Sequence, residues 1–149
     1  MLAINWIEQI KNNYIVYLGL HKRCVNISGI SIVKIDFLSI KNIEKTIEVI
    51  SPDIIINCIG LTNIEECEKF PEIAKEVNAI IPYNVAKICK KFGIKFIQIS
   101  TDHLFDGSQK LYKEEDIPNP QNQYAISKHQ AEINVSKILN NVSISKLIG

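Results

Sequence analysis

The sequence predicts an α/β fold with a parallel, doubly wound sheet, and two observations lead to that prediction. Short apolar runs alternate with longer segments in which apolar residues recur at helical spacing. The run at residues 53–60 is rich in β-branched side chains and too short for a helix, as expected of a parallel strand covered on both faces. Strands and helices that alternate in this way form parallel sheets with crossover helices.

Between residue 14 and that strand the sequence predicts three elements. Residues 14–18 and 31–36 are predicted strands, joined by a polar loop with no room for a full helix. Residues 40–50 carry isoleucines at helical spacing and are predicted to form an amphipathic helix, with Ser39 placed to cap it.

The second half continues the alternation. A helical stretch at residues 71–92 has an interruption at Pro82 and stops at Gly93. It is followed by a strand that ends at Thr101 and by a loop. The remaining predicted elements are a helix over residues 124–139 and a last strand within residues 142–148.

Composition limits the classes of function. The 149 residues, 46% hydrophobic and 22% charged, predict one globular domain over residues 1–149. A net charge of +1 provides no long-range field for nucleic acid or an anionic membrane, so neither partner is expected. The four cysteines form no C-x-x-C pair and are expected to be reduced, which favours a cytoplasmic protein with no metal site.

The stretch "FIQISTDHLFDG" at residues 96–107 places polar side chains at the end of a predicted strand. An apolar run stops there in Ser100, Thr101, Asp102 and His103. Proteins with α/β sheets commonly bind their ligands outside the carboxyl ends of the strands. These side chains are therefore candidate site residues.

Tyr124 and Lys128, in "YAISK", form the second part of the candidate site. Residues four apart share a helix face, so the phenol and the ammonium can point into one cleft. Tyrosine alone titrates near pH ~10, and a nearby cation lowers its pKa. If this helix packs beside the strand ending at Thr101, the hydroxyl and the phenol can act on one substrate oxygen, as hydride addition to a carbonyl requires. The same spacing also occurs by chance in many helices.

Four segments together resemble a known family. In chain order they are "PDIIINCIGLTNIEECEKFPEIAKEVNA", "ISTDHLFDG", "YKEEDIPNPQNQYAISKHQAE" and "SKLIG". They resemble extended short-chain dehydrogenase/reductases, and within them the dTDP-4-dehydrorhamnose reductase (RmlD-like sugar nucleotide-binding) group. The resemblance implies a Rossmann-type fold and reduction of the 4-keto group of a nucleotide-linked deoxysugar in dTDP-rhamnose biosynthesis.

The resemblance also implies roles for individual residues. Thr101 matches the family's catalytic hydroxyl and Tyr124 its proton donor. Lys128 matches the lysine that holds the nicotinamide ribose and lowers the tyrosine pKa, and Asp102 falls on a position that contacts the sugar. The expected cofactor contacts are Asp36 and Phe37 beside the adenine, the turn of Gly60, Leu61 and Thr62, and Ser100, Asn78, Tyr124 and Lys128. For Asn78, a structural cap at the Pro82 interruption is an equal alternative.

Some positions depart from the family pattern. His103 replaces a tyrosine and is expected to face solvent, and Ala125 replaces the glycine after the catalytic tyrosine. The basic residues His21, Lys22 and Arg23 follow the first predicted strand, where they favour NADP(H) over NAD(H) because a basic residue accommodates a 2′-phosphate. A solvated surface is the alternative interpretation of this basic loop.

No G-x-G-x-x-G turn occurs in the sequence. We therefore expect the first strand and its phosphate-binding turn to be missing, together with the C-terminal substrate domain. The missing strand would be central, and its absence would leave two unpaired sheet edges and a poorly stable chain. The chain is interpreted as part of a reductase whose full-length parent forms a homodimer.

Other classes of function remain open at this point. One is a regulatory subunit resembling that of methionine adenosyltransferase, which binds nucleotide and acts through a partner. Another is a structural remnant without a ligand. Nucleotide-sugar epimerases and dehydratases also share the Tyr-x-x-x-Lys pattern, so the reaction type is less secure than the superfamily.

Overall fold

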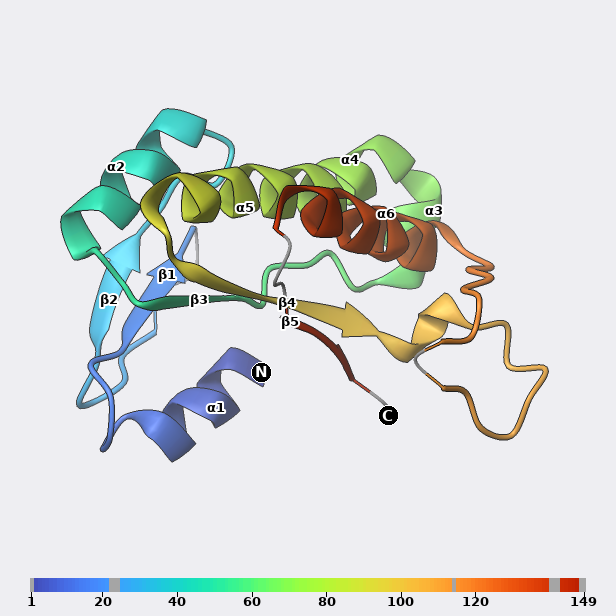
Figure 1. Ribbon diagram of the computed structural model, residues 1–149, viewed down its shortest axis with the longest axis horizontal. Coiled ribbons are helices and arrows are strands. Elements are labelled where there is room, and N and C mark those ends of the chain that lie inside the picture. The colour runs from blue at the N-terminus through green and yellow to red at the C-terminus, as the bar shows by residue number, and fades with distance from the viewer. Residues whose placement is uncertain (1, 22–24, 114, 140–142, 148–149) are drawn as a thin grey trace. The chain divides into compact units, whose positions relative to one another are not determined.

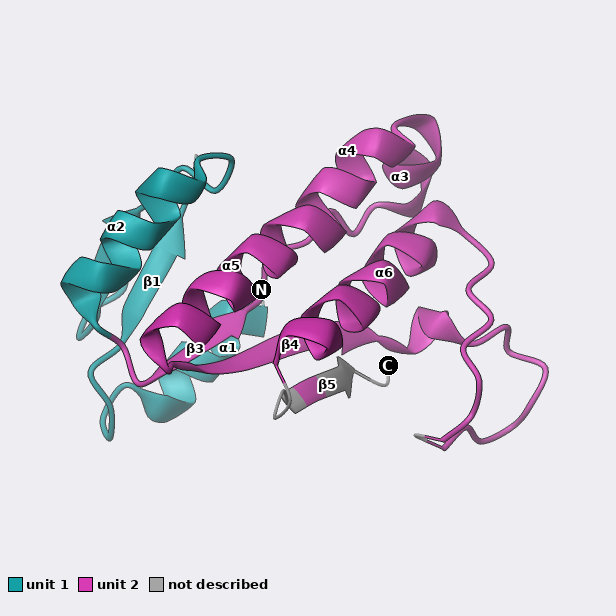
Figure 2. Cartoon of the chain, turned by 45° about the horizontal axis from the view of Figure 1, so that its top comes forward, with its two compact units in different colours: residues 1–51 teal, residues 52–149 magenta. Residues whose placement is uncertain are grey.

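The computed structural model describes residues 2–21, 25–113, 115–139 and 143–147 (Figure 1). The chain divides into two compact units, Met1–Ser51 and Pro52–Gly149, which Figure 2 colours separately. The strand pairs of the described residues are parallel, which confirms an α/β fold with parallel strands. In this described part, no helix is long and apolar enough to cross a membrane.

The first unit pairs two strands and carries two helices. Its elements are α1 (Leu2–Ile10), β1 (Tyr17–Leu20), β2 (Ser31–Lys34) and α2 (Ile40–Ile50). Strand β1 begins three residues later than predicted, and Tyr14 and Ile15 before it are exposed. Helix α2 is capped as predicted, because the Ser39 hydroxyl accepts a hydrogen bond from Asn42 N at 3.3 Å. Its buried face is formed by isoleucines at helical spacing.

The second unit is a three-stranded sheet with helices packed against it. Its elements are β3 (Ile54–Asn57), α3 (Ile64–Lys69), α4 (Pro71–Lys75), the π-helical segment η1 (Glu76–Ile80), α5 (Ile81–Phe92), β4 (Lys95–Thr101), the 3₁₀ turn η2 (Asp102–Leu104), α6 (Gln123–Ile138) and β5 (Ser143–Leu147). The strand order is β3, β4, β5. Helices α5 and α6 lie side by side and both contact β4, so the core of this unit lies between them and the sheet (Figures 1 and 2).

The helical stretch predicted at residues 71–92 is present as three consecutive segments. In η1 each hydrogen-bonded turn spans one more residue than in an α-helix, and Ile81 N donates to the carbonyl of Glu76, five residues earlier. Pro82 follows in the first turn of α5 and has no N–H to donate to the preceding turn, which accounts for the wider turn at the predicted interruption. Gly93 ends α5 in the left-handed region, with φ of 69°, as predicted.

The strand order of the two sheets bears on the predicted Rossmann-type topology. The pairs β1-β2 and β3-β4-β5 correspond to two parts of the Rossmann strand order. The absence of a first strand and its glycine turn stays a prediction.

Helix α3 was missed because it is only six residues long, and its start depends on Asn63, whose side chain accepts a hydrogen bond from Glu66 N.

Candidate active site

The carboxyl end of β4 holds the first candidate residues. The Thr101 side chain is buried, and its hydroxyl oxygen accepts a hydrogen bond from His103 N at 3.2 Å, which caps η2. The same hydroxyl lies 3.3 Å from Asp102 Oδ1 and donates to it. The strand end therefore turns sharply and leaves Asp102 half-buried and His103 exposed.

Tyr124 lies in the first turn of α6, which begins there because the Asn122 side chain accepts a hydrogen bond from Ala125 N at 2.8 Å. Its ring meets the imidazole of His103 edge to face, with ring centroids 5.7 Å apart. His103 is exposed as expected, but the sequence analysis missed this contact. The contact brings the end of β4 and the start of α6 together, as the proposed pairing of Thr101 with Tyr124 requires.

Lys128 lies one turn further along α6 and is buried. Its Nζ donates a hydrogen bond to the backbone oxygen of Ile99 on β4, 2.5 Å away. Burial lowers the pKa of Lys128 to about 8. The negative charges of the Glu132 carboxylate and the Cys58 thiolate act in the other direction and raise it. In the structure, the ammonium is thus held against the strand that ends in Thr101.

Asn78 connects the turn after β3 to α6. It is fully buried, and its Oδ1 accepts from Leu61 N at 2.8 Å. Its Nδ2 donates to Leu61 O and to the Ser127 hydroxyl, each at 3.0 Å. Ser127 in turn donates to Tyr124 O at 2.7 Å. Asn78 therefore fixes the predicted cofactor turn, whereas its direct contact with a cofactor stays a prediction.

A pair of buried amides next to Lys128 was missed by the sequence analysis. Asn57 Nδ2 donates to Gln98 Oε1 at 2.9 Å, across the β3-β4 pair in which these residues are opposite each other. Gln98 Nε2 donates to Ile99 O, the same oxygen that binds Lys128. The available signal was one amide side chain among the apolar residues of each strand, within Ile54–Asn57 and residues 96–99.

Three buried polar atoms of the described residues have no hydrogen-bond partner: Ser100 Oγ, His129 Nδ1 and Glu132 Oε1. Buried polar groups are normally hydrogen-bonded, so each such atom is a candidate for contact with a ligand. Ser100 is one of the predicted cofactor contacts. It follows Ile99 and precedes Thr101, so its side chain and that of Thr101 point to opposite faces of β4.

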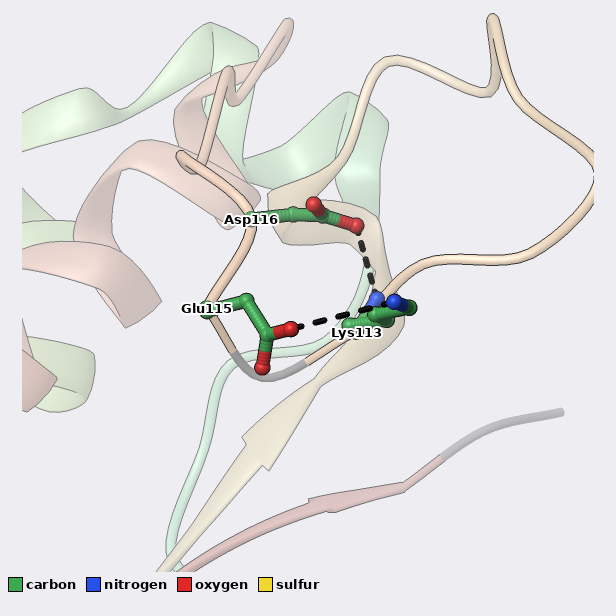
Figure 3. Close-up of polar contacts among 3 residues, drawn as sticks. All are labelled: Lys113, Glu115 and Asp116. Carbon is green, nitrogen blue, oxygen red and sulfur yellow. Dashed lines mark hydrogen bonds and ion pairs between the residues drawn. The ribbon is translucent and has the colours of Figure 1, made fainter.

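The loop between β4 and α6 contains the nine residues that line a surface pocket of about 350 Å³: Phe105, Asp106, Ser108, Gln109, Tyr112, Glu115, Asp116, Ile117 and Asn119. Figure 3 shows the turn at its far end, where Lys113 N donates to Asp116 Oδ2 at 2.7 Å. The Lys113 ammonium lies 3.9 Å from Glu115 Oε1, and both side chains are exposed. An ion pair of this kind contributes little to stability.

The predicted adenine contacts lie in the first unit. Asp36 follows β2, and its Oδ1 accepts a hydrogen bond from Leu38 N at 3.1 Å. The Phe37 ring lies 6.4 Å from that of His21. Lys22 and Arg23 lie outside the described residues. Within the described ranges, no group of three or more His, Cys, Asp or Glu side chains could hold a metal ion.

Comparison with known proteins gives consistent matches. The family model described as RmlD substrate binding domain matches residues 1–147. A probable low-salt glycan biosynthesis reductase, Agl14, of Haloferax volcanii is 34% identical over 100 residues, which are 66% of this chain and 33% of that protein. Methionine adenosyltransferase 2 subunit beta of Bos taurus is 37% identical over 81 residues, which are 54% of this chain and 24% of that protein.

Solved structures match as well. The dTDP-4-dehydrorhamnose reductase of Bacillus anthracis in complex with NADP has a TM-score of 0.74 at 32% identity, over 78% of this chain and 43% of that one. A hypothetical dTDP-4-dehydrorhamnose reductase from Sulfolobus tokodaii has a TM-score of 0.85 at 30% identity, over 97% of this chain and 51% of that one. The chain thus spans at most about half the length of these proteins. It belongs to the RmlD substrate binding domain family and is homologous to NAD(P)-dependent sugar-nucleotide reductases.

Proposed function

We propose that this chain is the cofactor-binding part of an NADP(H)-dependent reductase that converts the 4-keto group of a nucleotide-linked deoxysugar into a hydroxyl, as in dTDP-rhamnose biosynthesis. The contact of Tyr124 with His103 carries the proposal, because it brings the start of α6 to the end of β4. Thr101 and Tyr124 then lie on elements that meet at one edge of the sheet. The proposed protein is cytoplasmic and binds a nucleotide sugar.

The proposed reaction divides the work among three side chains. When the carbonyl carbon accepts a hydride, the π electron pair moves to the carbonyl oxygen, and that oxygen takes the proton of the Tyr124 phenol. Thr101 donates a hydrogen bond to the same oxygen, for which its hydroxyl must rotate away from Asp102. The Lys128 ammonium favours the resulting phenolate, which regains its proton from solvent.

The residues of the chain fit a nicotinamide cofactor, which would supply the hydride. Ser100 Oγ is buried without a partner, and Lys128 places a buried cation beside the same strand. In the proposal these two residues hold the nicotinamide ribose end. The turn of Gly60, Leu61 and Thr62 follows the pyrophosphate, and Asp36 and Phe37 bind the adenine. Lys22 and Arg23 favour the 2′-phosphate of NADP(H).

A second candidate function is supported by the match to methionine adenosyltransferase 2 subunit beta. In that case the chain binds a nucleotide and acts through a partner, without a reaction of its own. The two candidates differ in one respect that can be measured. A reductase consumes NADPH when a 4-keto sugar nucleotide is added, whereas a binding subunit does not.

Titration of NADPH fluorescence tests the proposal on two proteins, namely this chain and a form extended upstream in frame through any encoded strand and glycine turn. We expect the extended form to bind NADPH and to oxidise it in the presence of a 4-keto sugar nucleotide. Tyr124→Phe should lower that rate by on the order of a hundredfold or more, because it removes the proton donor, and should weaken NADPH binding much less than it slows turnover. Tyr83→Phe is the matched control.

Three outcomes would contradict the reductase proposal. If the extended form binds NADPH but does not oxidise it, the binding-subunit alternative replaces it. If neither form binds a nicotinamide cofactor, the site is a structural remnant. If Tyr124→Phe and Tyr83→Phe have equal effects on turnover, Tyr124 is not the proton donor.

A further inference from the structure

The loop that joins β4 to α6 is organised around the carboxylate of Asp106. Asp106 Oδ1 accepts hydrogen bonds from Ser108 N at 2.9 Å and from the Tyr112 hydroxyl at 2.7 Å. Asp106 Oδ2 accepts a third hydrogen bond, from Asn119 Nδ2 at 3.0 Å. Both carboxylate oxygens are thus used inside the loop, although the side chain is exposed.

Two of the loop's hydrogen bonds close its base. Asn119 N donates to Leu104 O at 2.8 Å, and the Asn119 side chain donates to Asp106. Leu104 is fully buried and lies three residues after Thr101. Asn119 lies five residues before Tyr124, so this pair of bonds joins the two chain segments that carry the proposed catalytic groups.

The tip of the loop has contacts of its own, and one of its groups, the Tyr112 hydroxyl, also bonds Asp106. The rings of Phe105 and Tyr112 are stacked, with centroids 4.3 Å apart and an angle of 12° between their planes. Gln109 N donates to the Tyr112 hydroxyl at 3.1 Å.

Lys113 and Asp116 bond to each other at the tip: Asp116 N donates to Lys113 O at 3.2 Å, and Lys113 N donates to Asp116 Oδ2 at 2.7 Å. Contacts at the tip can be removed while both partners of the Asp106–Asn119 bond and the backbone bond from Asn119 N to Leu104 O stay in place.

We propose that Asp106 and Asn119 are positioning residues for Tyr124. Their hydrogen bond, with the Leu104 backbone bond beside it, holds the start of α6 against the end of β4. Bringing the two ends of the loop between β4 and α6 together has an entropic cost. Hydrogen bonds between those ends offset this cost directly, whereas bonds further out in the loop do not. The catalytic consequence depends on the proposed function, whereas the geometric consequence does not.

Other hydrogen bonds also position the start of α6, so removing the Asp106–Asn119 bond should shift the helix without unfolding it. Asn122 caps the helix, and Gln123 N donates to Glu68 Oε1 of α3 at 2.7 Å. Helix α6 is thus expected to stay folded when the base bond is removed. What should change is the distance between its first turn and η2, which the ring contact of Tyr124 with His103 reports.

The test uses proton NMR of the chain itself and needs no ligand. The measured quantities are the nuclear Overhauser cross-peak between the His103 and Tyr124 ring protons and the ring-current shift on the imidazole. Asp106→Ala and Asn119→Ala should weaken the cross-peak and move the imidazole resonances toward those of Tyr124→Leu. Asn119→Ala serves if Asp106→Ala does not fold, because it removes a single exposed amide.

Two variants of the same loop are matched controls. Tyr112→Phe removes the phenol bonds, including the one to Asp106 Oδ1, but keeps the stacked rings and the Asp106–Asn119 bond. Asp116→Ala removes the side-chain acceptor of Lys113 N at the tip. Both should leave the ring contact of Tyr124 with His103 unchanged. The proposal is overturned if Asp106→Ala and Asn119→Ala also leave it unchanged, or if the tip variants alter it equally. A weakened contact in a chain that never oxidises NADPH would uphold the positioning role and reject only the reductase function.

Discussion

Replacing Lys128 by methionine should stabilise the fold at neutral pH, although the lysine is a proposed site residue. Lys128 is 5% exposed, and its pKa is lowered from 10.5 to about 8, chiefly by burial. Each pKa unit corresponds to about 1.4 kcal/mol, so holding the charged form in the folded state costs roughly 3 kcal/mol. Methionine has a similar volume and no charge, so we expect the free energy of unfolding at pH 7 to rise by about 1–3 kcal/mol.

The pH dependence of this effect has a definite sign. Between pH 8 and 10.5 the unfolded chain binds the Lys128 proton more tightly than the folded chain does, so the contribution of Lys128 to stability becomes more favourable as the pH rises. The difference between Lys128→Met and the wild type should therefore be largest below pH 8 and shrink toward pH 10.5. Cysteine ionisation occurs in the same pH range but is common to both proteins, apart from the coupling of Cys58 to Lys128.

Urea unfolding at several pH values measures this difference. Lys137→Met, on the exposed side of α6, is the matched control and should change stability by less than about 0.5 kcal/mol at every pH. The reasoning is refuted if Lys128→Met is less stable than the wild type at pH 7, or if the difference between them does not depend on pH. A confirmed result would mean that the buried ammonium is retained at a cost in stability, as expected of a functional group.

Three further predictions concern other buried or hydrogen-bonded groups. Hydrogen bonds from the Ser108 hydroxyl and backbone N–H, from Tyr112 and from Asn119 hold the pKa of Asp106 below its ordinary range. Ser108→Ala removes the hydroxyl and keeps the N–H, so carboxylate NMR should show it raising that pKa. An unchanged pKa in Ser108→Ala would contradict the assignment. Gln98→Leu leaves the Asn57 amide without its partner and should lower the free energy of unfolding by about 1–3 kcal/mol. The double replacement of Asn57 and Gln98 by leucine should cost less than the sum of the single changes, and full additivity would show that the amides do not interact. Burial raises the pKa of Cys89 to about 12, so peptide mapping after iodoacetamide treatment at pH 8 should find Cys89 unmodified in the folded chain and modified in urea.

The secondary structure of this chain was largely predictable from the sequence, because periodicity and capping are local. Ser39 caps α2 through an amide three residues later, and Gly93 ends the helix that it follows. Pro82 marked an interruption, but only the structure showed that the chain widens there into a π-helical turn. The short helix α3 was missed, since six residues carry too little periodicity to be distinguished from a loop.

The family and the candidate site residues could also be predicted from the sequence, because each motif lies within one strand end or one helix and is visible as a short run of residues. Thr101, Tyr124 and Lys128 could be named in this way. Their partners could not be, since each partner lies on a distant element. The oxygen that binds Lys128 belongs to Ile99, 29 residues away, and the hydroxyl that binds Asn78 belongs to Ser127, 49 residues away.

The sequence by itself thus determined most of the elements that form, which family the chain resembles and which side chains are candidates for its chemistry. The tertiary structure decided how those side chains are held. Hydrogen bonds between elements depend on how strands and helices pack, and no local pattern specifies which side chains packing brings together. The contact between Tyr124 and His103, the bond of Asp106 to Asn119 and the buried position of Lys128 all arise at that level.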